Sequence, residues 1–73
     1  MNIRYDQFSD ALFIRLKDGK YSESDEINKN IILDFDGDGN VMGIEILDAS
    51  NYMDINELSS VKFEINKKID KVS

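Results

Sequence analysis

The sequence predicts an α+β fold: a small antiparallel β-sheet of four to five short strands with one short helix packed on one face. Three observations support this prediction. Apolar and polar residues alternate in several short runs, as they do in strands with one buried face. Two of these runs are separated by an Asp-Gly turn signal. After residue 48 the spacing of apolar residues changes from two to three, which indicates a helix.

The first two strands are expected at residues 1–5 and 11–16. Ile3 and Tyr5 share one side of the first run, and every second residue from Leu12 shares one side of the next. Turn-favouring residues lie between the two runs, and Asp18-Gly19 ends the second. Residues 21–29 are polar apart from one isoleucine, so the sequence leaves open whether they form an edge strand or a loop.

Residues 31–36 and 41–47 form the clearest strand pair. Asp38-Gly39 predicts a two-residue type I′ turn between them, because both of its central residues need positive φ. In that register Leu33 lies opposite Ile44, and Phe35 lies opposite Met42. Directly opposite residues point to the same face, so one face of the pair becomes apolar throughout. The residues on that face are Ile31, Leu33, Phe35, Met42, Ile44 and Ile46.

The same acidic run also matches the twelve-residue calcium loop, in which carboxylates alternate before a glycine and a glutamate follows. Its candidate ligands are Asp34, Asp36, Asp38 and Glu45. A calcium loop needs helices on both sides, whereas the flanking alternation predicts strands, so we favour the hairpin and expect no metal or cofactor site. A weak divalent-cation contact at the turn formed by Asp34–Asp38 is the alternative.

Asp34 and Glu45 are expected to be diagonal neighbours on the polar face of the hairpin. Two close carboxylates can acquire different pKa values and perform acid–base chemistry. We favour a charged sheet face with Arg15 as counter-ion, because no imidazole or activated nucleophile accompanies the pair. Gly43 on the same face predicts a close approach of a neighbour, and Phe13 or Tyr5 is the expected one.

Beyond residue 48, Tyr52, Ile55 and Leu58 recur at intervals of three and predict a helix from about Ala49 to Ser59. Residues 61–65 alternate again and fit either a strand or a continuation of this helix. We assign residues 1–66 to a single domain and expect residues 67–73 to be a charged, frayed tail.

The composition excludes several classes of function. The chain of 73 residues has no cysteine and no histidine, which removes disulfides, thiolate ligands and imidazole bases. Its net charge of −6 argues against nucleic-acid binding, which depends on clustered Lys and Arg. No apolar run is long enough to span a membrane, and the N-terminus has no secretory signal, so we expect a cytoplasmic protein.

Four segments together resemble a known bacterial family. They are Tyr5-Asp6, residues 10–16 (DALFIRL), residues 32–36 (ILDFD) and residues 43–50 (GIEILDAS). The family, domain of unknown function 2283, carries a YD…DALYI-like segment followed by D-x-D…G…GIEIL-x-AS; Phe13 stands where tyrosine is common. The resemblance covers about residues 1–50. It implies a mainly antiparallel β domain with a helix, no established activity and no catalytic residues.

The predicted function is therefore a non-enzymatic protein-interaction module. A homodimer is expected, because so small a core leaves apolar area to cover. Three alternatives remain. One is an antitoxin-like partner of a small basic protein, suggested by the resemblance and by the acidic charge. The others are a weak divalent-cation binder, and an enzyme that uses Asp34 and Glu45.

Overall fold

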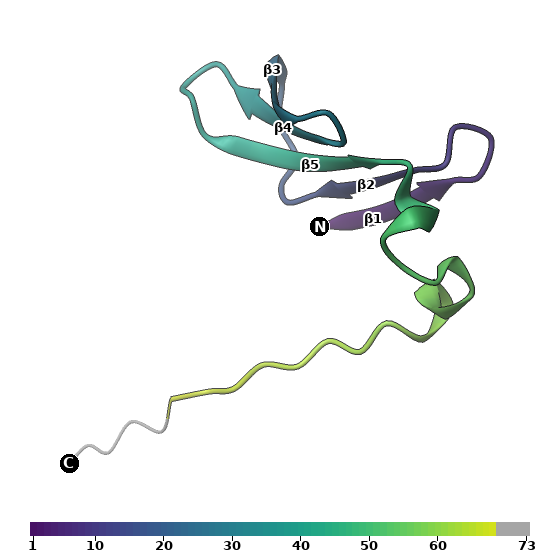
Figure 1. Ribbon diagram of the computed structural model, residues 1–73. Helices are drawn as coiled ribbons and strands as arrows, with labels where there is room; N and C mark the ends of the chain where they lie inside the picture. Colours follow the sequence, from purple (N-terminus) through teal and green to yellow (C-terminus); the bar gives the residue numbers. More distant parts are fainter. Residues whose placement is uncertain (69–73) are drawn as a thin grey trace.

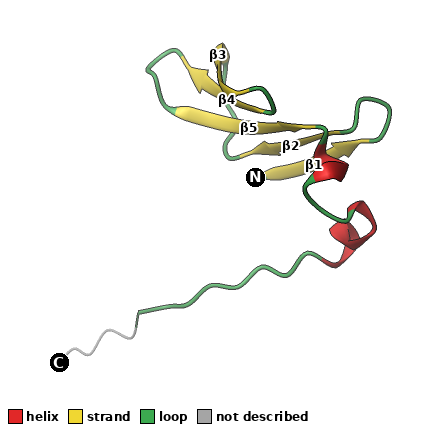
Figure 2. Ribbon diagram, in the orientation of Figure 1, coloured by secondary structure: helices red, strands yellow, loops and turns green. Residues whose placement is uncertain are grey.

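The computed structural model describes residues 1–68 and contains one five-stranded antiparallel sheet followed by two 3-10 segments (Figures 1 and 2). The strands are β1 (Asn2–Asp6), β2 (Ala11–Arg15), β3 (Tyr21–Asn28), β4 (Ile31–Asp36) and β5 (Val41–Leu47). Their order across the sheet is β1-β2-β5-β4-β3. The 3-10 segments are η1 (Ala49–Asn51) and η2 (Ile55–Ser60). The antiparallel sheet is confirmed, and the open question about residues 21–29 is resolved as an edge strand.

The sheet register sorts the side chains into two faces. One face, here called the apolar face, contains two rows of directly opposite residues. The first row is Ile3, Ile14, Ile44 and Leu33, and the second is Tyr5, Leu12, Ile46 and Ile31. The other face, here called the polar face, carries a row of Arg4, Phe13, Glu45 and Ile32 and a row of Asn2, Arg15, Gly43 and Asp34.

The β4–β5 hairpin has the predicted register over most of its length, with Leu33 opposite Ile44 and Ile31 opposite Ile46. The predicted type I′ turn at Asp38-Gly39 is wrong. The Gly39 amide donates to the Asp36 carbonyl oxygen over 3.1 Å, and Gly39 alone among the residues of this turn has positive φ, +83°. This is a three-residue loop, a type I turn followed by a left-handed glycine.

The longer loop shifts the pairing near the tip by one residue, so that Phe35 lies opposite Val41 instead of Met42. A bulge between Asp34 and Phe35 restores the predicted register and leaves Met42 without a direct partner in β4. Met42 is nevertheless buried, at 3% exposure. The predicted pairing of Phe35 with Met42 is therefore wrong.

The predicted helix over residues 49–59 is also wrong, because residues 1–68 contain 3-10 turns and no α-helix. Asp48 enters η1 in the left-handed conformation, with φ 54°. The Asp54 side chain then accepts a hydrogen bond from the Asn56 amide and starts a separate segment, η2. Short polar side chains such as these compete with helical hydrogen bonds. Neither 3-10 segment has the length and apolar character to cross a membrane, and the same holds for any helix within residues 1–68.

Residues 61–68 are extended but pair with no strand of the described chain. Figure 1 shows this segment running away from the sheet on the far side of β1. Residues 61–65 therefore form neither the expected strand nor the expected continuation of the helix. The predicted tail, residues 67–73, falls mainly on residues 69–73, which lie outside the described part.

The hydrophobic core is small. Only Ala11, Leu12, Met42 and Ala49 are buried apolar residues in the described chain. All six residues of β4 are half-buried, whichever face they point to. A strand in a two-layer fold would show alternation of buried and exposed residues, so this pattern indicates a single-layer sheet.

Candidate functional site

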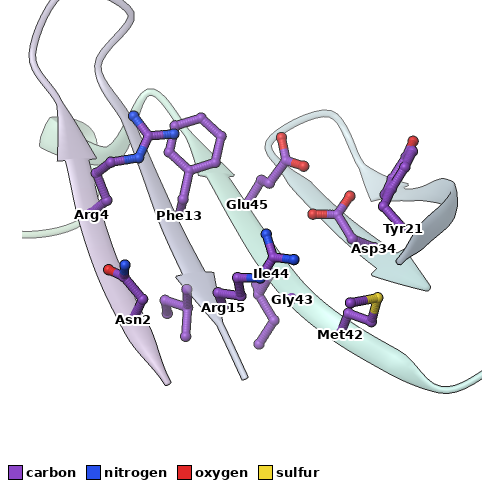
Figure 3. A pocket seen from close by; sticks show the side chains of 11 residues that line it. Asn2, Arg4, Phe13, Arg15, Tyr21, Asp34, Met42, Gly43, Ile44 and Glu45 are labelled. Carbon is purple, nitrogen blue, oxygen red and sulfur yellow. The ribbon is translucent and has the colours of Figure 1, made fainter. Parts of the chain in front are cut away.

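The carboxyl groups of Asp34 and Glu45 lie together on the polar face, as the predicted register required (Figure 3). The Ser24 hydroxyl donates to Asp34 Oδ1 over 2.6 Å. Burial, followed by the hydrogen bond with Asp34 and the charge of Asp34, raises the pKa of Glu45 to about 7. Glu45 therefore gains and loses its proton close to neutral pH.

The pair lines a shallow concavity of about 220 Å³ on the polar face. Other side chains around it include Arg4, Phe13, Arg15 and Tyr21 (Figure 3). The Arg4 guanidinium carbon lies 4.4 Å from the centre of the Phe13 ring, in a cation–π contact. The concavity thus combines two carboxyl groups with two guanidinium groups and two aromatic rings.

Arg15 is not the counter-ion of the carboxyl pair, and that prediction is wrong. Its Nε donates to the Lys17 carbonyl oxygen over 3.3 Å, and its Nη2 donates to the Gly19 carbonyl oxygen over 3.1 Å. Among the described residues, no ion pair joins Arg15 to Asp34 or Glu45. Arg15 instead holds the β2–β3 loop.

Gly43 allows the close packing at the centre of the polar face. A Cβ atom at this position would lie 3.0 Å from the Ile14 carbonyl oxygen and 3.6 Å from Asp34 Oδ2. The close approach expected at this glycine is therefore real. The neighbour is the β2 backbone and not Phe13 or Tyr5, so the predicted partner is wrong.

The four candidate calcium ligands separate into two groups. Asp34 and Glu45 lie on the polar face, whereas Asp36 and Asp38 belong to the hairpin tip. Asp36 Oδ1 accepts hydrogen bonds from the Asp38 and Asn40 amides, both at 2.9 Å, and Oδ2 accepts one from Lys17 Nζ at 2.9 Å. These bonds, above all the one from the Asn40 amide, hold the pKa of Asp36 well below its usual range. Within residues 1–68 no three carboxylates converge on a common point.

A second polar cluster lies at the other end of the sheet and was not predicted. Asp10 accepts hydrogen bonds from the Tyr5 hydroxyl at 2.6 Å and from the Ser50 hydroxyl at 2.6 Å. Its backbone carbonyl accepts a third from the Ala49 amide at 2.9 Å. The hydrogen bond from the Ser50 hydroxyl, followed by the bond from Tyr5, lowers the pKa of Asp10, and the bond to Asp10 raises the pKa of Tyr5. Asp10 therefore fastens the segment after β5 to the β1–β2 hairpin.

The signal for this cluster was already in the sequence. Tyr5, Asp10, Ala49 and Ser50 all belong to the segments that carry the family resemblance. Strand spacing alone could not bring them together, because Asp10 and Ser50 are 40 residues apart. Asp10 has a left-handed backbone conformation, with φ 53°, and its carboxylate accepts hydrogen bonds from both Tyr5 and Ser50.

The apolar face is the largest feature that the described chain leaves uncovered. Ile3 at its β1 edge is 50% exposed, and Ile14, Ile44 and Leu33 in the same row are only half-buried. The two 3-10 segments make only sparse contact with the strands. Figure 1 shows no second layer against the sheet.

The fold and its surfaces define a class: a small single-layer antiparallel β domain with a polar face and an open apolar face. The chain belongs to the DUF2283 family, described as proteins of unknown function, whose family model matches residues 2–50. An uncharacterized protein of Methanocaldococcus jannaschii is 36% identical over 75 residues, covering 97% of this chain. The chain spans 64% of the length of that relative. No solved structure matches the chain.

Proposed function

We propose that this protein is a non-enzymatic protein-interaction module that acts as a homodimer, with the apolar face as its contact surface. The observation that carries the proposal is the row of Ile3, Ile14, Ile44 and Leu33, whose side chains are exposed or only half-buried although they share one face of the sheet. An apolar sheet face is stable in water only when another layer covers it. Two such faces packed together form a β-sandwich, the simplest way to supply that layer.

The surface area supports the same conclusion. The chain exposes 6012 Å², whereas a folded monomer of its mass, 8.4 kDa, is expected to expose about 4,600 Å². The difference of about 1,400 Å² exceeds the roughly 800 Å² that each partner contributes to a typical stable interface. The extended segment 61–68, whose residues are all exposed, and the open apolar face both contribute to this difference.

The polar face gives weaker support for enzymatic function. Glu45, beside Asp34, has a pKa of about 7, but no histidine, serine or cysteine lines the concavity. The divalent-cation alternative is also disfavoured, because both oxygens of Asp36 already accept hydrogen bonds. An acidic surface remains suited to a basic protein partner, which makes heterodimerisation one outcome to test.

Two neighbouring substitutions in β4 test the proposal. Leu33 lies on the apolar face and Ile32 on the polar face, and both are half-buried. Sedimentation equilibrium should show that Leu33→Ser converts the dimer to a monomer while Ile32→Ser stays dimeric, with circular dichroism confirming that both remain folded. Equal effects of the two substitutions, or a monomeric parent protein, would contradict the proposal. A parent protein that dimerises only with a basic partner would point to the antitoxin-like alternative.

A further inference from the structure

The segment that follows η2 has the sequence pattern of a strand but no strand partner. In residues 61–68 (VKFEINKK), Val61, Phe63 and Ile65 alternate with polar residues. These three side chains are 58%, 76% and 66% exposed. Alternation of this kind is typical of a strand with one buried side. In the described chain neither that burial nor a backbone partner is present.

The β3 edge of the sheet offers an unpaired backbone. β3 pairs with β4 on one side only, and all eight of its residues are exposed. An edge strand presents free amide and carbonyl groups to any strand that can approach it. Glu23, Asp25 and Glu26 make this edge acidic. Two copies of β3 would bring these carboxylates against one another, and like charges on facing strands are destabilising. Pairing of β3 with the β3 strand of a second copy is therefore disfavoured, whereas pairing with a basic strand is favoured.

Segment 61–68 and the β3 edge are complementary in length and charge. Both have eight residues, and eight residues extend over about 26 Å in a strand. The segment supplies Lys62, Lys67 and Lys68 against a single acidic residue. The opposite edge, β1, is the poorer match, because it has only five residues and carries a basic side chain, Arg4.

We propose that segment 61–68 of one copy pairs with the β3 edge of a second copy and forms a sixth strand of its sheet. This inference rests on the proposed function, since it specifies how the two copies of the dimer are joined. Pairing within one chain is disfavoured because the segment leaves the domain beyond β1, at the edge of the sheet opposite β3 (Figure 1). Four strand spacings, about 19 Å, separate those two edges.

The side chains of β3 also fit an exchanged strand. Tyr21 and Ile27, near its two ends, are each 55% exposed. They offer apolar contacts to the alternating apolar residues of the segment, while the lysines meet the acidic residues between them. Main-chain hydrogen bonds supply the affinity in such strand addition, and the side-chain pattern supplies the specificity.

A charge-swap experiment on the full chain tests the exchange. One variant carries Glu23→Lys, Asp25→Lys and Glu26→Lys, and the other carries Lys62→Glu, Lys67→Glu and Lys68→Glu. Each alone should dimerise about tenfold or more weakly at low salt, because like charges then face each other. An equimolar mixture should recover the parent affinity as a heterodimer, because each segment then meets an edge of opposite charge. Pairing within one chain could not be rescued by mixing.

A matched control variant separates the effect of charge at the β3 edge from the effect of net charge. Asp18→Lys, Asp38→Lys and Glu57→Lys change the net charge as much as the β3 variant does, at exposed positions outside β3, and should leave the affinity unchanged. If the swapped variants dimerise like the parent while Leu33→Ser abolishes dimerisation, strand exchange is wrong and the proposed function stands. If the parent and every variant are monomeric, both are wrong. Failure of the mixture to recover the affinity overturns the exchange as well.

Discussion

Ionisation of Glu45 is predicted to destabilise the fold as the pH rises through neutrality. Its pKa is raised from 4.5 to about 7 in the folded protein, chiefly by burial and then by Asp34. Between these two values the folded state keeps a proton that the unfolded chain releases, so stability falls with increasing pH. The contribution is complete below pH 4.5 and is lost as the pH passes about 7.

The size of the effect follows from the difference between the pKa values of the folded and unfolded states. A tenfold difference in acidity corresponds to about 1.4 kcal/mol, so the rise from 4.5 to about 7 sets an upper bound of about 3.4 kcal/mol. Glu45 is partly exposed on an open face, and solvent screening reduces this to about 1–2 kcal/mol. Glu45→Gln cannot ionise and keeps the hydrogen-bonding shape, so it should match the parent near pH 4 and exceed its stability by that amount near pH 8.

Urea denaturation at a fixed protein concentration, repeated from pH 4 to pH 8, measures this difference. Glu57→Gln, an exposed carboxyl group in η2, is the matched control and should follow the parent at every pH. A Glu45→Gln variant whose stability tracks that of the parent across the range would refute the account of the pair. NMR titration of the Glu45 carboxyl carbon offers an independent measurement.

Three further predictions concern the backbone and the Asp10 cluster. Gly43→Ala should lower the free energy of unfolding by about 1–3 kcal/mol in chemical denaturation, because its Cβ would lie 3.0 Å from the Ile14 carbonyl oxygen. Gly37→Ala, whose Cβ would have no atom within 4 Å, should be nearly neutral, and equal costs of the two substitutions would contradict the close packing at Gly43. Gly39→Ala should cost about 1 kcal/mol, because φ at this residue is +83°, and a stability unchanged from the parent would contradict the three-residue loop. Asp10→Ala should lower the melting temperature more than Asp10→Asn, since asparagine tolerates positive φ and keeps an acceptor for Tyr5 and Ser50; the reverse order would rule out that role.

The sequence was sufficient to predict the sheet because its signals are local and agree with one another. Residues 31–36 and 41–47 alternate strongly, and the apolar set fixed Leu33 opposite Ile44. The turn was the exception. Asp38-Gly39 suits a two-residue turn, but the Asp36 side chain bonds the amides of Asp38 and Asn40 and stabilises a loop one residue longer. The bulge between Asp34 and Phe35 compensates for the extra loop residue, so the predicted register is kept in the rest of the hairpin.

The elements after β5 were harder to predict because their apolar spacing suggested a helix that the polar residues do not support. Asp48 and Asp54 each redirect the backbone, and the expected helix becomes two short 3-10 segments. The carboxyl pair followed from the hairpin register, whereas the Asp10 cluster depends on a contact between residues 40 positions apart. Long-range side-chain contacts of this kind leave no periodic signal in the sequence.

The mass of the unmodified protein in solution tests the central claim most directly. The chain has a mass of 8.4 kDa, and monomeric soluble proteins rarely expose a large contiguous apolar patch. Sedimentation equilibrium across the micromolar range should give twice that mass, with dissociation only on dilution. A mass of one chain at every concentration would contradict the proposal that the apolar face joins two copies.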